Sequence, residues 1–157
     1  MTSPISRILL VCSGNTCRSP LAAAILSARL AETAEWREVT VESAGTSAWD
    51  GAPASEGSYL VALERGLDLS SHRARVLTAD IVRSADLILT MGASHLARVR
   101  DLGGSRKSHL LSQFSGEDSG DVSDPFGRDV AVYRETAEQL DQLMSQVVAR
   151  LQREHAP

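Results

Sequence analysis

A thiol, a guanidinium group and several small polar residues stand together near the start of the chain. The segment Cys12-Ser13-Gly14-Asn15-Thr16-Cys17-Arg18-Ser19 follows a compact apolar run, residues 7–11, and precedes Pro20. The apolar run indicates a buried strand, and proline is favoured at the first position of a helix. The segment is therefore expected to form a loop between a strand and a helix N-terminus.

Such a loop suits a bound phosphate group. Backbone N–H groups at a helix N-terminus point at one spot, and the helix dipole favours an anion there. Gly14 and Asn15 can adopt the left-handed conformations that a tight anion-binding loop requires. Arg18 can hold two phosphate oxygens with its planar fork. The positive surroundings favour the thiolate of Cys12, a nucleophile, and Ser19 can donate its hydroxyl to that sulfur.

Phosphoryl transfer also needs an acid that protonates the leaving group. Asp124, in Asp124-Pro125-Phe126-Gly127, is the best candidate. As a carboxylate it could then activate the water molecule that releases phosphate. Asp-Pro alone is a common turn, so this assignment depends on its combination with the Cys12 segment. A nucleotide-binding P-loop is excluded, because no Gly-Lys-Ser/Thr follows the glycine.

The composition is typical of a cytoplasmic protein with a single domain, residues 1–157. Of its 157 residues 43% are hydrophobic, and no apolar run is long enough for a membrane span or a signal peptide. The net charge of -4, without a basic cluster, argues against nucleic acid as a partner. Two close cysteines without a second ligand pair indicate chemistry rather than a disulfide framework or zinc, so no metal or cofactor is expected.

Strand and helix patterns alternate along the chain. Strands are expected at residues 7–11, 38–42, 85–91 and 107–111, and helices from residue 19 and at 55–65, 78–83, 94–101 and 132–151. Residues 112–123 are expected to form a polar surface loop. The apolar stripe of the last helix suits either the core or a second subunit. The alternation predicts an α/β fold with a parallel sheet covered by helices on both faces. In such folds ligands bind beyond the carboxyl ends of the strands, which is where Cys12 falls.

At this point the sequence resembles the low-molecular-weight protein tyrosine phosphatases, from Ile8 to about Leu151. The resemblance rests on residues 12–20 and on Asp124-Pro125-Phe126, in this order and at this separation. It implies a four-stranded parallel sheet and hydrolysis of phosphorylated proteins through a phosphocysteine, with inorganic phosphate as product. Cys12 would be the nucleophile, Arg18 the phosphate clamp and Asp124 the general acid.

The resemblance also implies roles around the loop. Asn15 would hold the loop shape, anchored by Ser43 and His72, and Ser19 would stabilise the thiolate. Trp49 and Phe126 would line the mouth of the cleft, and Cys17 would trap oxidised Cys12 as a disulfide. Taken alone, His72 equally suits a surface turn and Trp49 simple packing.

Several positions depart from the tyrosine phosphatase pattern. Thr16 replaces a frequent isoleucine, Gly127 replaces an aromatic residue, and residues 91–95 lack the Asp and Asn often found after Met91. Thr16 with Asp124-Pro125-Phe126-Gly127 resembles the protein arginine phosphatase branch of the same family. The shorter, hydroxyl-bearing Thr16 could accommodate a planar guanidino leaving group, so phosphoarginine is favoured over phosphotyrosine.

Two other functions suit the same loop. A thiol-linked arsenate reductase shares the fold, but it passes electrons through further cysteines, and none follows Cys17. A non-enzymatic anion-binding or redox-switch domain could use Cys12 and Cys17 alone. Such a domain needs no general acid, so the presence of Asp124 argues against it.

Overall fold

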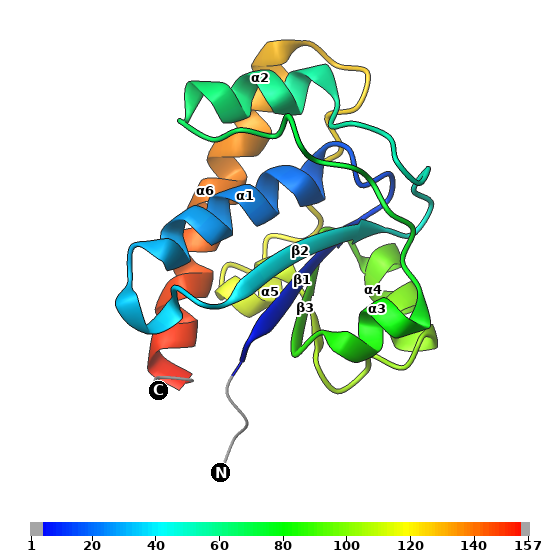
Figure 1. The fold of residues 1–157 in the computed structure, drawn as a ribbon, viewed down its shortest axis with the longest axis vertical. Helices are drawn as coiled ribbons and strands as arrows, with labels where there is room; N and C mark the ends of the chain where they lie inside the picture. The colour runs from blue at the N-terminus through cyan, green and yellow to red at the C-terminus, as the bar shows by residue number, and fades with distance from the viewer. Residues whose placement is uncertain (1–4, 155–157) are drawn as a thin grey trace.

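Four parallel strands form the centre of the fold (Figure 1). The structure is a computed structural model that describes residues 5–154. The strands are β1 (Arg7–Cys12), β2 (Thr40–Gly45), β3 (Leu87–Thr90) and β4 (Ser108–Leu110), in the order β2-β1-β3-β4. The parallel α/β sheet expected from the alternating pattern is confirmed.

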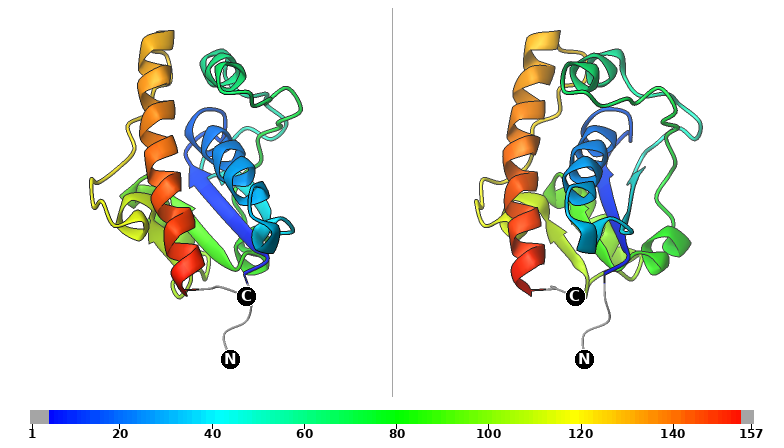
Figure 2. Two further views of the ribbon diagram at one scale, coloured as in Figure 1. Left: turned by 90° about the vertical axis from the view of Figure 1, so that its left-hand side faces the viewer. Right: turned by 60° about the vertical axis from the view of Figure 1, so that its left-hand side comes forward.

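Helices connect the strands and cover both faces of the sheet. They are α1 (Arg18–Ala31), the 3-10 helix η1 (Ala34–Trp36), α2 (Glu56–Glu64), α3 (Ala79–Ser84), α4 (Ala93–Asp101), α5 (Leu111–Ser115) and α6 (Val130–Glu154). In Figures 1 and 2, α1 and α6 lie on one side of the sheet and α3 and α4 on the other. Within the described residues, no helix has the length and apolar character that a membrane crossing requires.

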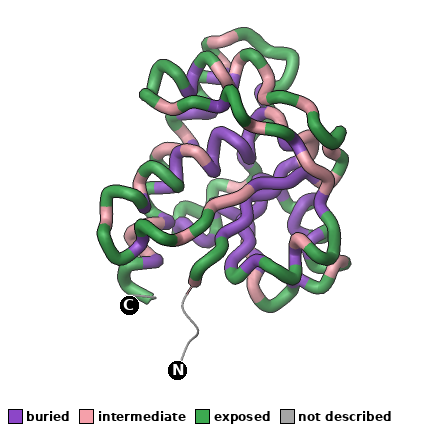
Figure 3. Tube along the Cα trace, viewed as in Figure 1, coloured by how far each residue is buried: buried purple, intermediate pink, exposed green. Residues whose placement is uncertain are grey.

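Alternating residues of β1 build two separate cores. Ile8 and Leu10 pack with α1 and α6, whereas Leu9 and Val11 pack with Val82 of α3 and Val99 of α4. Strands β1 and β3 are buried almost throughout their length, whereas β2 is buried only in its second half (Figure 3). Cys12 belongs to the first core, so its side chain leaves β1 on the α1 side.

The longest helix, α6, uses its apolar stripe inside this domain. It packs against α1. Eight of its residues are buried: Tyr133, Thr136, Ala137, Leu140, Leu143, Met144, Val147 and Leu151. The sequence left open whether this stripe packs in the core or against a second subunit, and the structure shows it packed in the core.

Two expected segments differ from the structure. Residues 112–115 are not a surface loop, because α5 buries Phe114, whose ring lies under the Arg150 guanidinium at 4.0 Å. Ser112 is also buried and donates to the carbonyl of Gly120, at 2.7 Å. This segment is therefore helical because Phe114 packs against α6, although its local sequence is mostly polar. Strand β2 begins later than expected and continues to Gly45, because it pairs with β1 up to Cys12.

Candidate active site

The Cys12 loop lies at the carboxyl end of β1, beside the end of β2. Cys12 is paired with Gly45 in the sheet register, and helix α1 begins at Arg18. A Cβ atom at Gly45 would overlap the carbonyl oxygen of Ser13 and lie 2.9 Å from the amide nitrogen of Asn15. Only glycine therefore allows β2 to approach the loop this closely.

The thiol of Cys12 is buried, with 2% of the residue exposed, and lies 3.0 Å from the hydroxyl of Ser19. The Asn15 amide donates to the same hydroxyl at 2.8 Å. Because that hydroxyl oxygen already accepts from Asn15, its own proton is available to the sulfur. A hydroxyl in this position can donate to the sulfur, and the thiolate is the nucleophilic form of cysteine.

Asn15 carries the strain of the loop. Its φ of +57° is left-handed, whereas Gly14, expected to share this conformation, has no positive φ. Asparagine tolerates the left-handed region because its short polar side chain can form local hydrogen bonds. Here the Asn15 side chain also donates to Ser43 Oγ at 2.9 Å, and it accepts from the backbone N–H of Arg75 at 2.9 Å.

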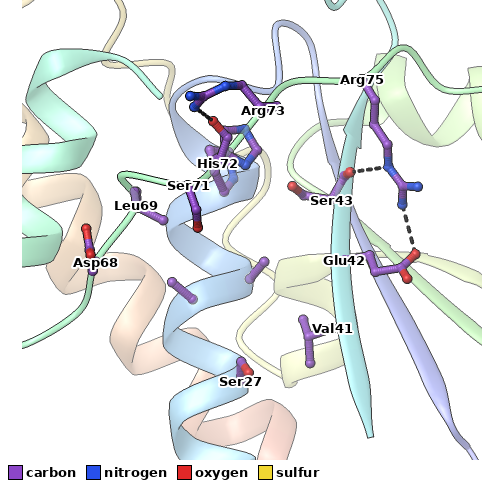
Figure 4. A pocket seen from close by; sticks show the side chains of 13 residues that line it. Ser27, Val41, Glu42, Ser43, Asp68, Leu69, Ser71, His72, Arg73 and Arg75 are labelled. Atoms are coloured by element: carbon purple, nitrogen blue, oxygen red, sulfur yellow. Dashed lines mark hydrogen bonds and ion pairs between the residues drawn. The ribbon is translucent and has the colours of Figure 1, made fainter. Parts of the chain in front are cut away.

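Behind Asn15, the extended segment before α3 supports the loop. The ring of His72 donates from Nε2 to the Asn15 carbonyl oxygen at 2.7 Å, and its pKa is lowered chiefly by burial, against the effect of that hydrogen bond. Arg75 donates to the Ser43 carbonyl at 3.0 Å and to the Glu42 carboxylate at 2.8 Å, as Figure 4 shows. The structure thus brings Ser43 and His72 to Asn15, and it adds Arg75, which the sequence analysis missed.

Arg18 and Asp124 meet on the opposite side of the loop. The Arg18 side chain is almost fully buried, and its Nη1 donates to the Val122 carbonyl at 2.9 Å. Its Nη2 lies 3.6 Å from Asp124 Oδ2. Arg18 Nε is buried and has no hydrogen-bond partner among residues 5–154. A buried guanidinium N–H without a partner is unusual, and an anion bound over the loop would satisfy it.

A cavity of about 260 Å³ opens above the thiol. Its lining brings together most of the residues expected at the site: Cys12, Ser13, Gly14, Thr16, Cys17, Arg18, Ser47, Asp124 and Phe126. Asp124 accepts from the backbone N–H of Phe126 at 3.1 Å, and the Phe126 side chain, largely exposed, also lines the cavity. Trp49 is not in this lining, and 83% of it is exposed.

A larger cavity, about 580 Å³, lies between α1, β2 and the segment before α3 (Figure 4). Its lining contains Ser43, His72 and Arg75, but neither cysteine. It is therefore a space behind the loop supports, and the smaller cavity is the one that contains the chemistry.

Both cysteines are free, and Cys17 is turned toward α2 and α6. Its Sγ lies 3.2 Å from Ser55 Oγ and 3.4 Å from the hydroxyl of Tyr133. Thr16 lies between the two thiols in sequence, with its hydroxyl 3.8 Å from Cys17 Sγ. Within the part of the chain that the structure describes, no group of three or more His, Cys, Asp or Glu side chains could hold a metal ion.

Comparisons with known proteins agree with this geometry. Residues 7–156 match the sequence model of the family described as low molecular weight phosphotyrosine protein phosphatase. A protein-arginine-phosphatase from Geobacillus stearothermophilus is 37% identical over 94% of this chain and 97% of its own. The low molecular weight protein-tyrosine-phosphatase PtpB from Staphylococcus haemolyticus is 38% identical over 85% of this chain and 91% of its own.

A solved structure of the YwlE arginine phosphatase from Geobacillus stearothermophilus superimposes with a TM-score of 0.87 and 35% identity, covering 96% of this chain and 95% of that one. The loop, the fold and the sequence matches all lead to one family, whose members are cysteine-based hydrolases of phosphorylated proteins. The chain belongs to the low molecular weight phosphotyrosine protein phosphatase family.

Proposed function

We propose that this chain hydrolyses phosphoarginine side chains of cytoplasmic proteins, with Cys12 as nucleophile, Arg18 as phosphate clamp and Asp124 as general acid. The Cys12 thiolate forms a bond to phosphorus while the bond from phosphorus to the guanidino nitrogen breaks. Asp124 gives its proton to the departing nitrogen, which leaves as part of a neutral or cationic guanidino group. The product of this first step is a phosphocysteine.

The second step regenerates the enzyme. A water molecule attacks phosphorus, the Asp124 carboxylate takes its proton, and the sulfur–phosphorus bond breaks to give the Cys12 thiolate and inorganic phosphate. The Arg18 guanidinium and the loop N–H groups stabilise the charge on the equatorial phosphoryl oxygens in both steps. Ser19, 3.0 Å from the sulfur, stabilises the thiolate when it attacks and when it leaves.

Thr16 is the observation that carries the choice of phosphoarginine. It lines the cavity over Cys12, and its hydroxyl lies 3.5 Å from the position that a Cβ atom would take on Gly14. A β-branched hydrophobic residue there would press against a leaving group with its methyl groups only. The hydroxyl of threonine can instead accept a hydrogen bond from a guanidino N–H, which a phenyl ring does not offer.

The test is steady-state turnover of a phosphoarginine peptide and a phosphotyrosine peptide of the same sequence, with reductant present. Wild type is expected to prefer phosphoarginine, and Cys12→Ser is expected to hydrolyse neither. Thr16→Ile should lower the ratio of the two kcat/KM values about tenfold or more. Thr40→Ile, an equal change at the exposed start of β2, should leave the ratio unchanged. An unchanged ratio in Thr16→Ile would exclude the proposed role of Thr16.

A further inference from the structure

A histidine outside the proposed catalytic set contacts the Cys12 loop. His95 lies in the first turn of α4, with 4% of it exposed, and its Nε2 is 2.8 Å from Ser13 Oγ. Ser13 follows the nucleophile directly and lines the cavity above it. The contact therefore joins α4, on one face of the sheet, to a hydroxyl beside the expected position of the phosphoryl group.

The direction of this hydrogen bond follows from the other ring nitrogen. His95 Nδ1 is buried and has no hydrogen-bond partner among the described residues. A buried N–H without an acceptor is rarer and more costly than an unpaired acceptor. The proton of the neutral ring therefore belongs on Nε2, and Nε2 donates to the Ser13 oxygen. The pKa of His95 is lowered by burial and by the charge of Arg18, against Asp121 and Asp124, which agrees with a neutral ring.

This direction decides what Ser13 presents to the cavity. Ser13 Oγ has no second hydrogen-bond partner among residues 5–154, so its own O–H remains free to donate. Phosphoryl oxygens are acceptors only. If the hydrogen bond ran the other way, Ser13 would donate its proton to the ring nitrogen. Only its lone pairs would then face the phosphoryl oxygens, which are themselves acceptors.

The surroundings of His95 fix the ring in this place. A Cβ atom on Gly92 would lie 3.3 Å from Cε1 of His95 and 2.9 Å from Asp121 Oδ2, so glycine allows both groups to approach. Asp121 Oδ1 accepts from the backbone N–H of Ala93 at 3.0 Å, where it caps α4 from outside the helix. Asp121 thus holds the start of α4, two residues before the histidine that contacts the loop.

We propose that His95 is a positioning residue for the phosphatase reaction, whose Nε2–H holds the Ser13 hydroxyl so that it donates to a phosphoryl oxygen. Ser13 then adds one side-chain donor to the loop N–H groups and Arg18. The proposal rests on the proposed function of Cys12, because it concerns the same bound phosphoryl group.

Two substitutions of His95 distinguish the effect of its N–H donor from the effect of its size. In His95→Gln the side-chain N–H takes the place of Nε2–H, whereas His95→Met has similar length and no donor. His95→Met and Ser13→Ala should each lower kcat/KM about tenfold, because each removes one hydrogen bond to a charged group. The double variant should be no worse than either single one, and His95→Gln should retain most of the wild-type activity.

Thermal midpoints of all variants, with His109→Gln as a control on β4, report any loss of folding. If the effects of His95→Met and Ser13→Ala multiply to about a hundredfold, or if His95→Gln is as poor as His95→Met, the proposal is wrong. The same variants are titrated with inorganic phosphate by calorimetry, so that the coupling is also read without turnover. Turnover that persists in Cys12→Ser would overturn the proposed function alone. If the losses of phosphate affinity in His95→Met and Ser13→Ala simply add in the double variant, the proposed role of His95 is wrong.

Discussion

The hydroxyl of Tyr133, on α6, lies 3.4 Å from the sulfur of Cys17. Burial raises the pKa of Tyr133 to about 12, so the hydroxyl keeps its proton at neutral pH and can donate it to the sulfur. Ser55 contacts the same sulfur at 3.2 Å. The sulfur of Cys17 is therefore held by the hydroxyl groups of Ser55 and Tyr133, which both lie outside the Cys12 loop.

This contact predicts how the loop responds to oxidation. We expect peroxide to convert the Cys12 thiolate to a sulfenic acid, and the Cys17 thiol then to form the disulfide with loss of water. Cys17 must first leave its hydroxyl partners, and one such hydrogen bond is worth about 1 kcal/mol. Tyr133→Phe should therefore raise the share of disulfide over further-oxidised Cys12 about fivefold, measured by mass spectrometry after a peroxide pulse. Tyr59→Phe, on α2, serves as the control, and an equal rise there would contradict the role of Tyr133.

Replacement of Gly45 by alanine is expected to reduce both stability and activity. A methyl group at this position would overlap the Ser13 carbonyl and displace the loop. Gly45→Ala should lower the free energy of unfolding by about 1–3 kcal/mol and reduce kcat/KM as well. Gly51→Ala is the matched control, because Gly51 has a φ of +88° but open space around it. That change should cost about 1 kcal/mol of stability and leave kcat/KM unchanged. Equal kinetic effects at both glycines would contradict this explanation.

The loop itself could be predicted from the sequence because its signals are local. An apolar run, a nucleophile, a residue that tolerates positive φ and a proline at the helix start occur within residues 7–20, and the structure builds β1, the loop and α1 from them. The two cores of the sheet follow from the same kind of signal, since adjacent residues of a strand face opposite sides.

The partners of the loop could not be predicted in this way. Arg75 reaches Asn15 through its backbone N–H, a group that every residue except proline carries. His95 contacts Ser13 from 82 positions away, and only the parallel pairing of β1 with β3 brings the start of α4 to the loop. Helix α5 was missed for a similar reason, because a short polar sequence becomes helical only where Phe114 is covered by α6.

The histidines predict how stability depends on pH. The pKa values of His72, His95 and His109 are all lowered, with burial as the largest cause in each. The folded state therefore binds these protons less readily than the unfolded state, whose histidines titrate near 6.5. Stability should be complete above about pH 6.5 and decrease as the pH falls below it.

Thermal midpoints measured between pH 5 and 8 at constant ionic strength would check this dependence. His109→Gln removes one of the three groups at a position far from the Cys12 loop, so its midpoint should fall less steeply than that of wild type. A midpoint that rises from pH 6.5 toward pH 5 would show that the sign is wrong.

Arg18→Lys is expected to lower turnover strongly, because each nitrogen of the Arg18 guanidinium has a different role. Nη1 holds the Val122 carbonyl, Nη2 lies 3.6 Å from Asp124 Oδ2, and Nε has no hydrogen-bond partner among the described residues. A lysine keeps the charge but offers one compact ammonium group, which cannot serve the carbonyl, the carboxylate and a phosphoryl oxygen in this geometry. We expect kcat/KM to fall by about two orders of magnitude or more, together with the affinity for inorganic phosphate. Arg29→Lys, which changes an arginine paired with Asp141 at 2.7 Å, should leave both unchanged. Near-normal turnover in Arg18→Lys would mean that charge alone suffices at this position and that the fork geometry has no part in catalysis.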